Sequence, residues 1–310
     1  MIRHGSPEWH EARRSMVTAT DIPVLLGLSP YKCEADLADE KRGLTAGQPS
    51  SMRMRVGSAL EELIGQEYAE VTGQKVRPWP GLAVSKGIDW AAASPDFRVV
   101  GQRRLVEAKH TGSRSRFADG LPQDVEAQVA WQLGVTGYPV ADVAVLIGDD
   151  DLRIIEVAAD PDLFANLVTV ATDFRRRLAA GGPFSKDNAR VRREYPQDNG
   201  DQITADQDLT DTVRFLGTVR DQIKRLKEQE EQAETAIMDR MGPATILTGD
   251  GFRVSWKRTK DRESTDWKSL GSSLLRTLPE TESTALVGLY TTVSPGFRPL
   301  RVVIGKGDTE

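Results

Sequence analysis

The stretch WAAASPDFRVVGQRRLVEAKH, residues 90–110, constrains the fold most strongly, because its pattern is typical of two strands joined by a tight turn. A two-residue loop at Gly101-Gln102 suits a hairpin and places Asp96 opposite Glu107. Opposed residues on one face of such a pair have Cβ atoms roughly 4.5–5.5 Å apart. Lys109 follows Glu107 by two positions and so shares that face. The sequence therefore predicts two carboxylates and an ammonium group on one patch.

Two facing carboxylates repel each other, and a divalent cation between them removes the conflict. The oxygens of Asp96 and Glu107 suit Mg²⁺, which usually keeps several waters and takes one or two carboxylates plus substrate phosphates. Such a site hydrolyses phosphodiesters, because the metal activates a water and neutralises charge on the phosphate in the transition state. Lys109 would orient that water or stabilise the charge. The alternative is a surface hairpin with its charges facing solvent.

The composition excludes several classes of protein. With 39% apolar and 28% charged residues, the 310-residue chain is ordinary for a soluble globular protein. Its single cysteine, Cys33, excludes an internal disulfide and suits a reducing compartment. With three histidines in addition, a zinc site made of histidine and cysteine is nearly ruled out. No apolar run of about 18 residues predicts a membrane span, and the first residues lack a signal-peptide core, so we expect a cytoplasmic protein.

The net charge of −5 argues against a protein that coats nucleic acid by bulk charge. The net charge does not exclude a protein that encloses DNA locally, because cations are concentrated around the predicted hairpin. Between residues 96 and 116, six cations accompany two acids: Arg98, Arg103, Arg104, Lys109, Arg114 and Arg116. The later cluster at 175–177 is more typical of a solvated face.

The spacing of apolar residues, together with residues typical of helix ends, predicts an α/β core with a mixed central sheet flanked by helices. Besides the hairpin, we expect helices at 54–72, 122–137 and 161–180, and strands at 82–85, 142–147 and 152–157. Short helices are expected after Ser6 and from residues 17–21 onward. The core is predicted to span 1–184, and the polar segment 185–206 to be a linker.

The remainder, 207–310, is predicted to be a C-terminal domain with a long charged helix at 208–241 and a small β hairpin at 244–258. Apolar residues of this helix recur at spacings of three and four, which gives it one apolar stripe. The stripe would pack against a coiled-coil partner or against the domain's own small sheet. The sequence assigns no role to this domain.

Two predicted helices carry polar residues at regular spacing. In the helix 54–72, Gly57, Glu61 and Gly65 are spaced four apart on one stripe. An acid between two glycines indicates a place where something approaches the helix closely. In the helix 122–137, Gln128 and Gln132 are stacked on one face.

Four separated motifs resemble, in their order, those of one known family. They are Trp9, Arg13 and Thr18-Ala19-Thr20-Asp21; Gly57-x-x-x-Glu61; Ser94-Pro95-Asp96 with Glu107-Ala108-Lys109; and Gln128-x-x-x-Gln132-Leu133-x-Val135-Thr136-Gly137. The core, roughly residues 5–180, resembles the YqaJ-like viral recombinases, phage exonucleases related to lambda exonuclease within the PD-(D/E)XK nuclease superfamily. The resemblance implies a restriction-endonuclease-like core, and it weakens beyond residue 180.

The resemblance further implies a metal-dependent 5′→3′ exonuclease that acts on ends of linear double-stranded DNA. Such enzymes leave 3′ single strands for a partner annealing protein during recombination, and relatives form rings that enclose DNA, so a homo-oligomer is expected. Asp96, Glu107 and the Ala108 carbonyl would bind Mg²⁺, with Mn²⁺ as a possible substitute. Glu61 would be a further carboxylate, and Lys109 would be the catalytic lysine.

Three more residues acquire implied roles from the resemblance. Arg13 and Thr20 match the positions that hold a 5′-phosphate, and Gln128 would lie beside the metals or the DNA backbone. An arginine gives a phosphate bidentate contacts, and Thr20-Asp21 lies at a predicted helix N-terminus, which adds partial positive charge. Thr20 departs from the family, in which serine is common, but its hydroxyl can still donate to a phosphate.

Two other functions stay open on the sequence alone. The same fold serves endonucleases and single-strand-specific nucleases, because a fold does not fix function. A different class is a catalytically inactive scaffold that binds DNA ends and recruits partners through the long helix. The intact Asp96, Glu107 and Lys109 speak against the scaffold.

Overall fold

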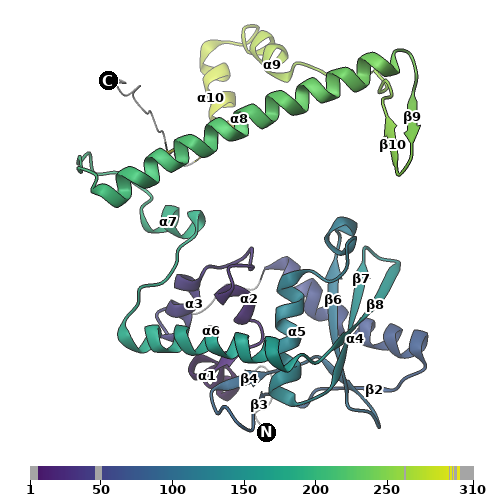
Figure 1. Cartoon of the computed structure of the whole chain (residues 1–310). Coiled ribbons are helices and arrows are strands. Elements are labelled where there is room, and N and C mark those ends of the chain that lie inside the picture. Colours follow the sequence, from purple (N-terminus) through teal and green to yellow (C-terminus); the bar gives the residue numbers. More distant parts are fainter. Residues whose placement is uncertain are drawn as a thin grey trace, which may run out of the picture. The chain divides into compact units, whose positions relative to one another are not determined.

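The computed structural model describes residues 6–45, 51–261 and 263–292, together with Ser294, Gly296, Pro299 and Leu300. Residues 301–310, the end of the predicted C-terminal domain, lie outside the described residues. The chain forms two compact units, residues 1–194 and residues 195–310 (Figure 1). None of the described helices is both long enough and apolar enough to cross a membrane.

The described residues of the first unit form two sheets. The larger is mixed and has the strand order β2-β5-β6-β7-β8, in which β6 and β7 are parallel and the other neighbours antiparallel. Its strands are β2 (Val76–Pro78), β5 (Phe97–Val99), β6 (Arg104–Thr111), β7 (Val140–Ile147) and β8 (Asp151–Ala158). The smaller sheet has the order β1-β4-β3, with β1 (Val17–Thr18), β3 (Ala83–Val84) and β4 (Ala91–Ala93). The predicted mixed central sheet is thereby confirmed.

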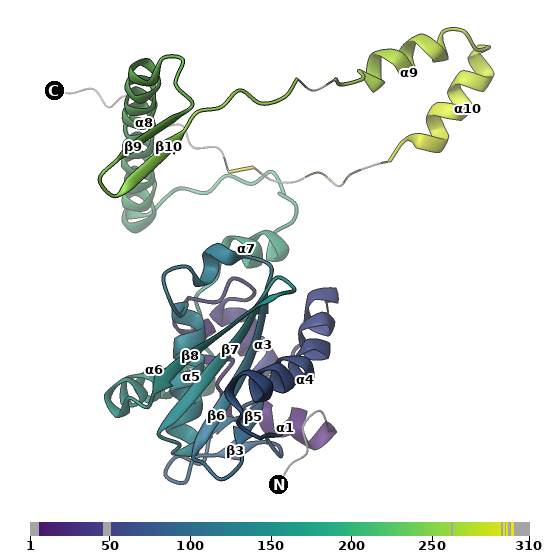
Figure 2. The ribbon, with the colours of Figure 1, turned by 90° about the vertical axis from the view of Figure 1, so that its right-hand side faces the viewer.

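Helices cover both faces of the larger sheet (Figures 1 and 2). On one face lies α4 (Met52–Thr72), whose Tyr68 is buried in the apolar cluster that joins this helix to β5 and β6. On the other lies α5 (Gln123–Thr136), whose Val129 is buried against β7, and α6 (Pro161–Ala180) packs against α5. The remaining elements of the unit are α1 (Pro7–Ser15), α2 (Ile22–Leu25), α3 (Glu34–Lys41), a 3-10 turn (Arg114–Phe117) and α7 (Asn188–Glu194).

The predicted register of the hairpin is confirmed, but its first strand is not continuous. Phe97 of β5 pairs with Val106 of β6, so the next position outward brings Asp96 opposite Glu107. The chain leaves the smaller sheet at the end of β4 and enters the larger sheet at the start of β5. Pro95 lies in the break, where its missing N–H group costs no sheet hydrogen bond.

The strands β1 and β2 were not expected from the sequence. β1 lies where we expected a helix to open, and Val17 pairs in parallel with Ala91. The Thr18 amide and hydroxyl both donate to Asp21 Oδ2, at 2.8 and 2.9 Å, which turns the chain before α2 begins. Both strands are too short to give a periodic signal in the sequence. Their pairing also depends on partners far away in the sequence.

A buried ion pair fixes this N-terminal turn to α3. Lys41 Nζ lies 2.6 Å from Asp21 Oδ2 and also donates to the carbonyls of Arg13 and Met16, each at 2.7 Å. The two charged side chains are 4% and 1% exposed. Burial by itself raises the pKa of Asp21, but Lys41, Lys32 and Arg13 outweigh burial and lower this pKa below its usual value.

We expect Asp21→Asn to lower the free energy of unfolding by about 3–5 kcal/mol, because it leaves the Lys41 ammonium buried without its counter-charge. Urea denaturation at neutral pH measures this loss. Glu11→Gln is the matched control, because it removes an acid from an exposed pair with Arg14 and should change stability little. Equal unfolding midpoints for Asp21→Asn and Glu11→Gln would contradict the importance of the buried pair.

The first unit ends at Glu194, later than the predicted boundary at residue 184. The segment after Phe184 is bound to α3, because the Ser185 amide donates to Glu34 Oε2 at 3.0 Å and Arg190 Nη1 to Asp39 Oδ2 at 2.7 Å. Arg193 Nη2 adds an ion pair with Asp36 at 2.8 Å. The polar composition of residues 185–206 predicted a linker, whereas polar side chains in its first part attach it to the core.

The second unit contains the predicted long helix, α8 (Gln207–Met241), and the predicted hairpin, β9 (Ile246–Gly249) and β10 (Phe252–Ser255). It also contains α9 (Trp267–Leu275) and α10 (Glu280–Tyr290). Ile223 and Leu226 of the apolar stripe are 48% and 63% exposed, so the described residues leave this part of the stripe uncovered.

Candidate active site

Backbone amides on both sides hold Asp96 at the break between the two sheets. The Trp79 amide donates to the Asp96 carbonyl at 2.9 Å, which continues the pairing of β2 with β5. The Ala108 amide of β6 donates to Asp96 Oδ2 at 2.8 Å. The carboxyl group of Asp96 is therefore fixed against the strand that carries Glu107 and Lys109.

Glu107 is the most heavily bonded acid of this centre and is 2% exposed. Lys109 Nζ and Gln128 Nε2 donate to its Oε1, at 2.5 and 2.6 Å. Gln132 Nε2 donates to its Oε2 at 2.7 Å. The structure thus brings the predicted residues Asp96, Glu107, Lys109 and Gln128 together.

Gln132 was not predicted as a site residue, although its spacing of four from Gln128 placed it on the same helix face. Its side chain is 1% exposed, and its Oε1 has no hydrogen-bond partner among the described residues. The signal was present in the sequence as two glutamines stacked on α5. What the sequence lacked was the direction of that face, which α5 turns toward β6.

Electrostatic repulsion is concentrated in this centre. Burial and the charge of Glu107 raise the pKa of Asp96 well above its usual range, and the same two causes raise the pKa of Glu61. Burial alone would lower the pKa of Lys109, but Glu107, Asp96 and Glu61 outweigh burial and raise it. Lys109 is therefore a cation at neutral pH. The other three groups are acids, so the charge balance favours one further cation.

The oxygen donors fit magnesium. In the part of the chain that the structure describes, no three or more histidine, cysteine, aspartate or glutamate side chains gather closely enough to hold a metal by themselves. Magnesium does not need such a cage, because it takes one or two carboxylates and fills its other positions with waters and substrate phosphates. The carboxylates of Asp96 and Glu107 are hard oxygen donors of this kind, and Ala108 follows Glu107 directly in β6.

The close approach predicted at the glycines of α4 is confirmed at Gly65. A Cβ atom on Gly65 would lie 2.8 Å from the ring of Phe97, the residue after Asp96, whereas one on Gly57 would meet nothing within 4 Å. Gly65 therefore lets α4 pack directly on β5. This contact sets the distance between Glu61 on the helix and Asp96.

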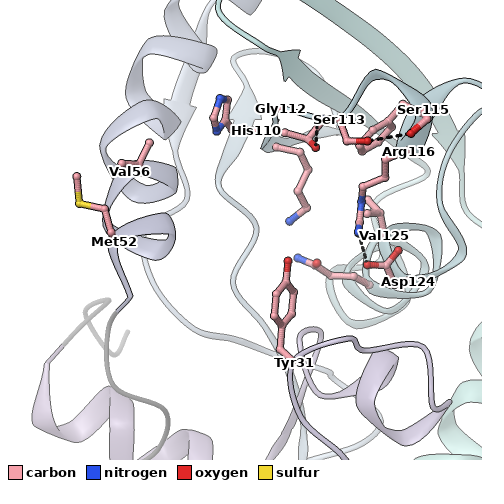
Figure 3. A pocket seen from close by; sticks show the side chains of 14 residues that line it. Tyr31, Met52, Val56, His110, Gly112, Ser113, Ser115, Arg116, Asp124 and Val125 are labelled. Atoms are coloured by element: carbon pink, nitrogen blue, oxygen red, sulfur yellow. Dashed lines mark hydrogen bonds and ion pairs between the residues drawn. The ribbon is translucent and has the colours of Figure 1, made fainter. Parts of the chain in front are cut away.

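The centre opens into two cavities. One, of about 910 Å³, is lined by Lys109 and Gln128 together with Tyr31 and Arg116. Figure 3 shows Tyr31 directed into this cavity and Arg116 bonded to Asp124 at its wall. The other, of about 790 Å³, contains Glu61 and Asp96 and continues along β2. Both cavities have room for parts of a nucleic-acid strand.

The predicted phosphate-binding pair forms a second cluster. Arg13 Nη2 donates to Thr20 Oγ1 at 2.9 Å, and the Arg13 guanidinium lies 4.4 Å from the centre of the Trp9 ring. The Thr18–Asp21 turn presents Thr20 to the arginine. Among the described residues, no direct contact joins this pair to Asp96 or Glu107.

The chain is similar to several known proteins. Residues 8–139 match the YqaJ-like viral recombinase domain. The uncharacterized protein YqaJ of Bacillus subtilis is 24% identical over 263 residues, which cover 81% of this chain and 82% of that protein. An alkaline exonuclease from Laribacter hongkongensis is 26% identical with a TM-score of 0.48, covering 57% of this chain and 94% of that one. A phage-related exonuclease from Haemophilus somnus is 10% identical with a TM-score of 0.42, covering 54% and 96%.

The family match and the site support the same conclusion. The matched segment contains every residue that the sequence motifs singled out, and the acidic centre suits phosphodiester chemistry, so together they support a nuclease. Residues 8–139 of this chain match the YqaJ-like viral recombinase domain, the family that the sequence motifs indicated.

Proposed function

We propose that this protein is a magnesium-dependent exonuclease that degrades the 5′-ended strand of linear double-stranded DNA and leaves 3′ single strands. The observation that carries the proposal is the pair Asp96 and Glu107, which face each other across two strands beside the Lys109 ammonium. Two cavities adjoin this centre, so a strand has room on either side of a phosphate bound there.

Asp96, Glu107 and the Ala108 carbonyl would hold the metal, and Glu61 would add a carboxylate at the helix side of the centre. Bound Mg²⁺, or Mn²⁺ in its place, supplies charge neutralisation at the phosphate and a water of lowered pKa. The mutual repulsion of the acids supports this assignment, because each carboxyl group gains from a shared cation.

The chain's own residues prepare the centre for that chemistry. Lys109 stays protonated and stabilises the negative charge that develops on the phosphate oxygens. Gln128 and Gln132 hold both oxygens of Glu107, so its carboxylate keeps one orientation. Preorganised partners of this kind do not have to reorient during the reaction.

Recognition of a DNA end is assigned to Arg13 and Thr20. The Arg13 guanidinium can give a terminal phosphate two parallel hydrogen bonds, and the Thr20 hydroxyl can give a third. We expect Arg13→Ala to reduce the ratio of rates on 5′-phosphorylated and 5′-hydroxyl ends by about tenfold or more. Arg14→Ala, at the exposed neighbour paired with Glu11, is the control. An unchanged ratio in Arg13→Ala would remove this residue from the phosphate pocket.

The whole proposal is tested with a linear duplex labelled at one 5′ end or at one 3′ end, next to a closed circular DNA. Early release of 5′-labelled mononucleotide with Mg²⁺, prevented by EDTA, and with 3′ strands and circle intact, is the expected result. Cutting of the circle would replace the proposal with an endonuclease. Binding without any product would replace it with an inactive scaffold.

The proposal extends to two partners. Long 3′ single strands are the substrate of annealing proteins, so we propose such a protein as a partner in recombination. We also propose that identical subunits form a ring, which would keep the enzyme on its DNA between successive cuts. Native mass measurement and DNA-length dependence of processivity test the ring.

A further inference from the structure

Two arginines lie directly opposite each other on the edge of the larger sheet. Arg77 of β2 is the antiparallel partner of Arg98 of β5, and both are exposed. Directly opposed residues have Cβ atoms roughly 4.5–5.5 Å apart, and like charges in that position destabilise a strand pair. This is an unfavourable arrangement for an isolated sheet edge.

No acid compensates for this repulsion. Among the described residues, neither Arg77 nor Arg98 makes a side-chain hydrogen bond or an ion pair, and the side chain of Lys75 nearby makes none either. Other arginines of the same unit behave differently: Arg104 is paired with Asp142 and Glu156. The edge of β2 and β5 therefore keeps a cationic surface without a counter-ion of its own.

Arg77 lies between the arginine pair and the acidic centre, because it borders a cavity at each of them. Arg77 and Lys75 line the same cavity of about 790 Å³ that contains Glu61 and Asp96. Arg77 also lines a neighbouring cavity of about 260 Å³, together with Arg98 and Arg103. Arg77 is thus common to the cavity that contains the carboxylates and the cavity that contains Arg98.

Strand geometry gives the spacing between the arginine pair and the acidic centre. Arg98 follows Asp96 by two positions, so both side chains leave the same face of the chain, roughly 6–7 Å apart. A polyanion whose charge repeats along its length can reach both Arg98 and the carboxylates. A single small anion cannot.

We propose that Arg77 and Arg98 form a phosphate-binding site for the DNA backbone next to the phosphate at the acidic centre. This inference rests on the proposed function, because it takes DNA as the substrate, and it adds the path of the strand. Guanidinium groups suit the purpose because each contacts a phosphate through two hydrogen bonds. Such contacts position DNA without reading its sequence.

The test is the salt dependence of DNA binding by the full-length double variant Arg77→Ala/Arg98→Ala. Binding of a 5′-phosphorylated duplex is measured in EDTA, so that cleavage does not enter the result. Each phosphate contact adds about 0.9 to the slope of log K against log[salt]. We therefore expect the slope of the double variant to be shallower by about 1.8, with similar weakening for unrelated duplex sequences.

The control is Arg176→Ala/Arg225→Ala, which changes the net charge by the same amount at other exposed positions. Its slope should equal that of the unaltered protein. An unchanged slope in Arg77→Ala/Arg98→Ala, or an equal change in the control, would overturn the proposal. A lower melting temperature of the double variant would also overturn it, because removing opposed like charges should not destabilise the edge. These outcomes do not depend on whether the protein cleaves DNA, so failure of the exonuclease proposal would be recognised separately.

Discussion

Replacing Glu107 with glutamine should lower the rate of DNA cleavage by about a thousandfold, the upper end of the loss seen when one electrostatic partner of a transition state is removed. The change removes the negative charge that would hold the metal, and it keeps the size and shape of the side chain. One amide oxygen remains to accept from Gln132, but Lys109 and Gln128 lose their acceptor if the amide nitrogen takes the place of Oε1.

Single-turnover cleavage of an end-labelled duplex at saturating protein and Mg²⁺ measures this effect. Binding of the same duplex in EDTA should be retained, because the loss concerns the metal and not the fold. Glu62→Gln is the matched control, since Glu62 is the exposed acid next to Glu61 on α4. A Glu107→Gln rate within tenfold of the unaltered protein would show that this carboxylate is no metal ligand.

Replacing Lys109 with methionine should lower the single-turnover rate by about 100- to 1,000-fold, in the range expected for loss of one charged group at the transition state. Burial by itself lowers the pKa of Lys109, but Glu107, Asp96 and Glu61 outweigh burial and raise it, so we expect the lysine to act as a cation and not as a base. Methionine has a similar length and no charge. DNA binding should change far less than the rate.

The Lys109→Arg variant separates the effect of the charge from the effect of the side-chain shape. The planar guanidinium of Lys109→Arg keeps the charge but does not fit the position of a compact ammonium 2.5 Å from Glu107, so it should not restore the full rate. Lys86→Met, at an exposed lysine, should cleave normally. A Lys109→Met protein with a normal rate would mean that Glu107 and the metal stabilise the phosphate without this lysine.

Local signals account for the parts of the fold that were predicted well. The Gly101-Gln102 loop fixed the register of β5 and β6, because a hairpin of known loop length has only one register. Long periodic segments gave α5, α6 and α8 nearly to their ends. The acidic centre followed from the same register, since Asp96, Glu107 and Lys109 share one face.

Features that depend on distant partners were not visible in the sequence. The strands β1 and β2 are recognisable only through their pairing with β4 and β5. The domain boundary was misplaced because Arg190 and Arg193 attach to α3 through charge, and a polar segment held in this way looks like a linker. The second role of α5, to hold both oxygens of Glu107, required knowing that Gln132 faces β6.

The position of Asp96 has a consequence for the dynamics of the protein. Asp96 lies where the chain crosses from β4 in one sheet to β5 in the other, while Glu107 lies within β6. A cation bound by both carboxylates would therefore hold the crossing segment against the larger sheet. Local opening of β4 and β5 must then break that shared coordination, so their amide hydrogens should exchange more slowly when the centre is occupied. Binding at the centre and cohesion between the two sheets would then be thermodynamically linked.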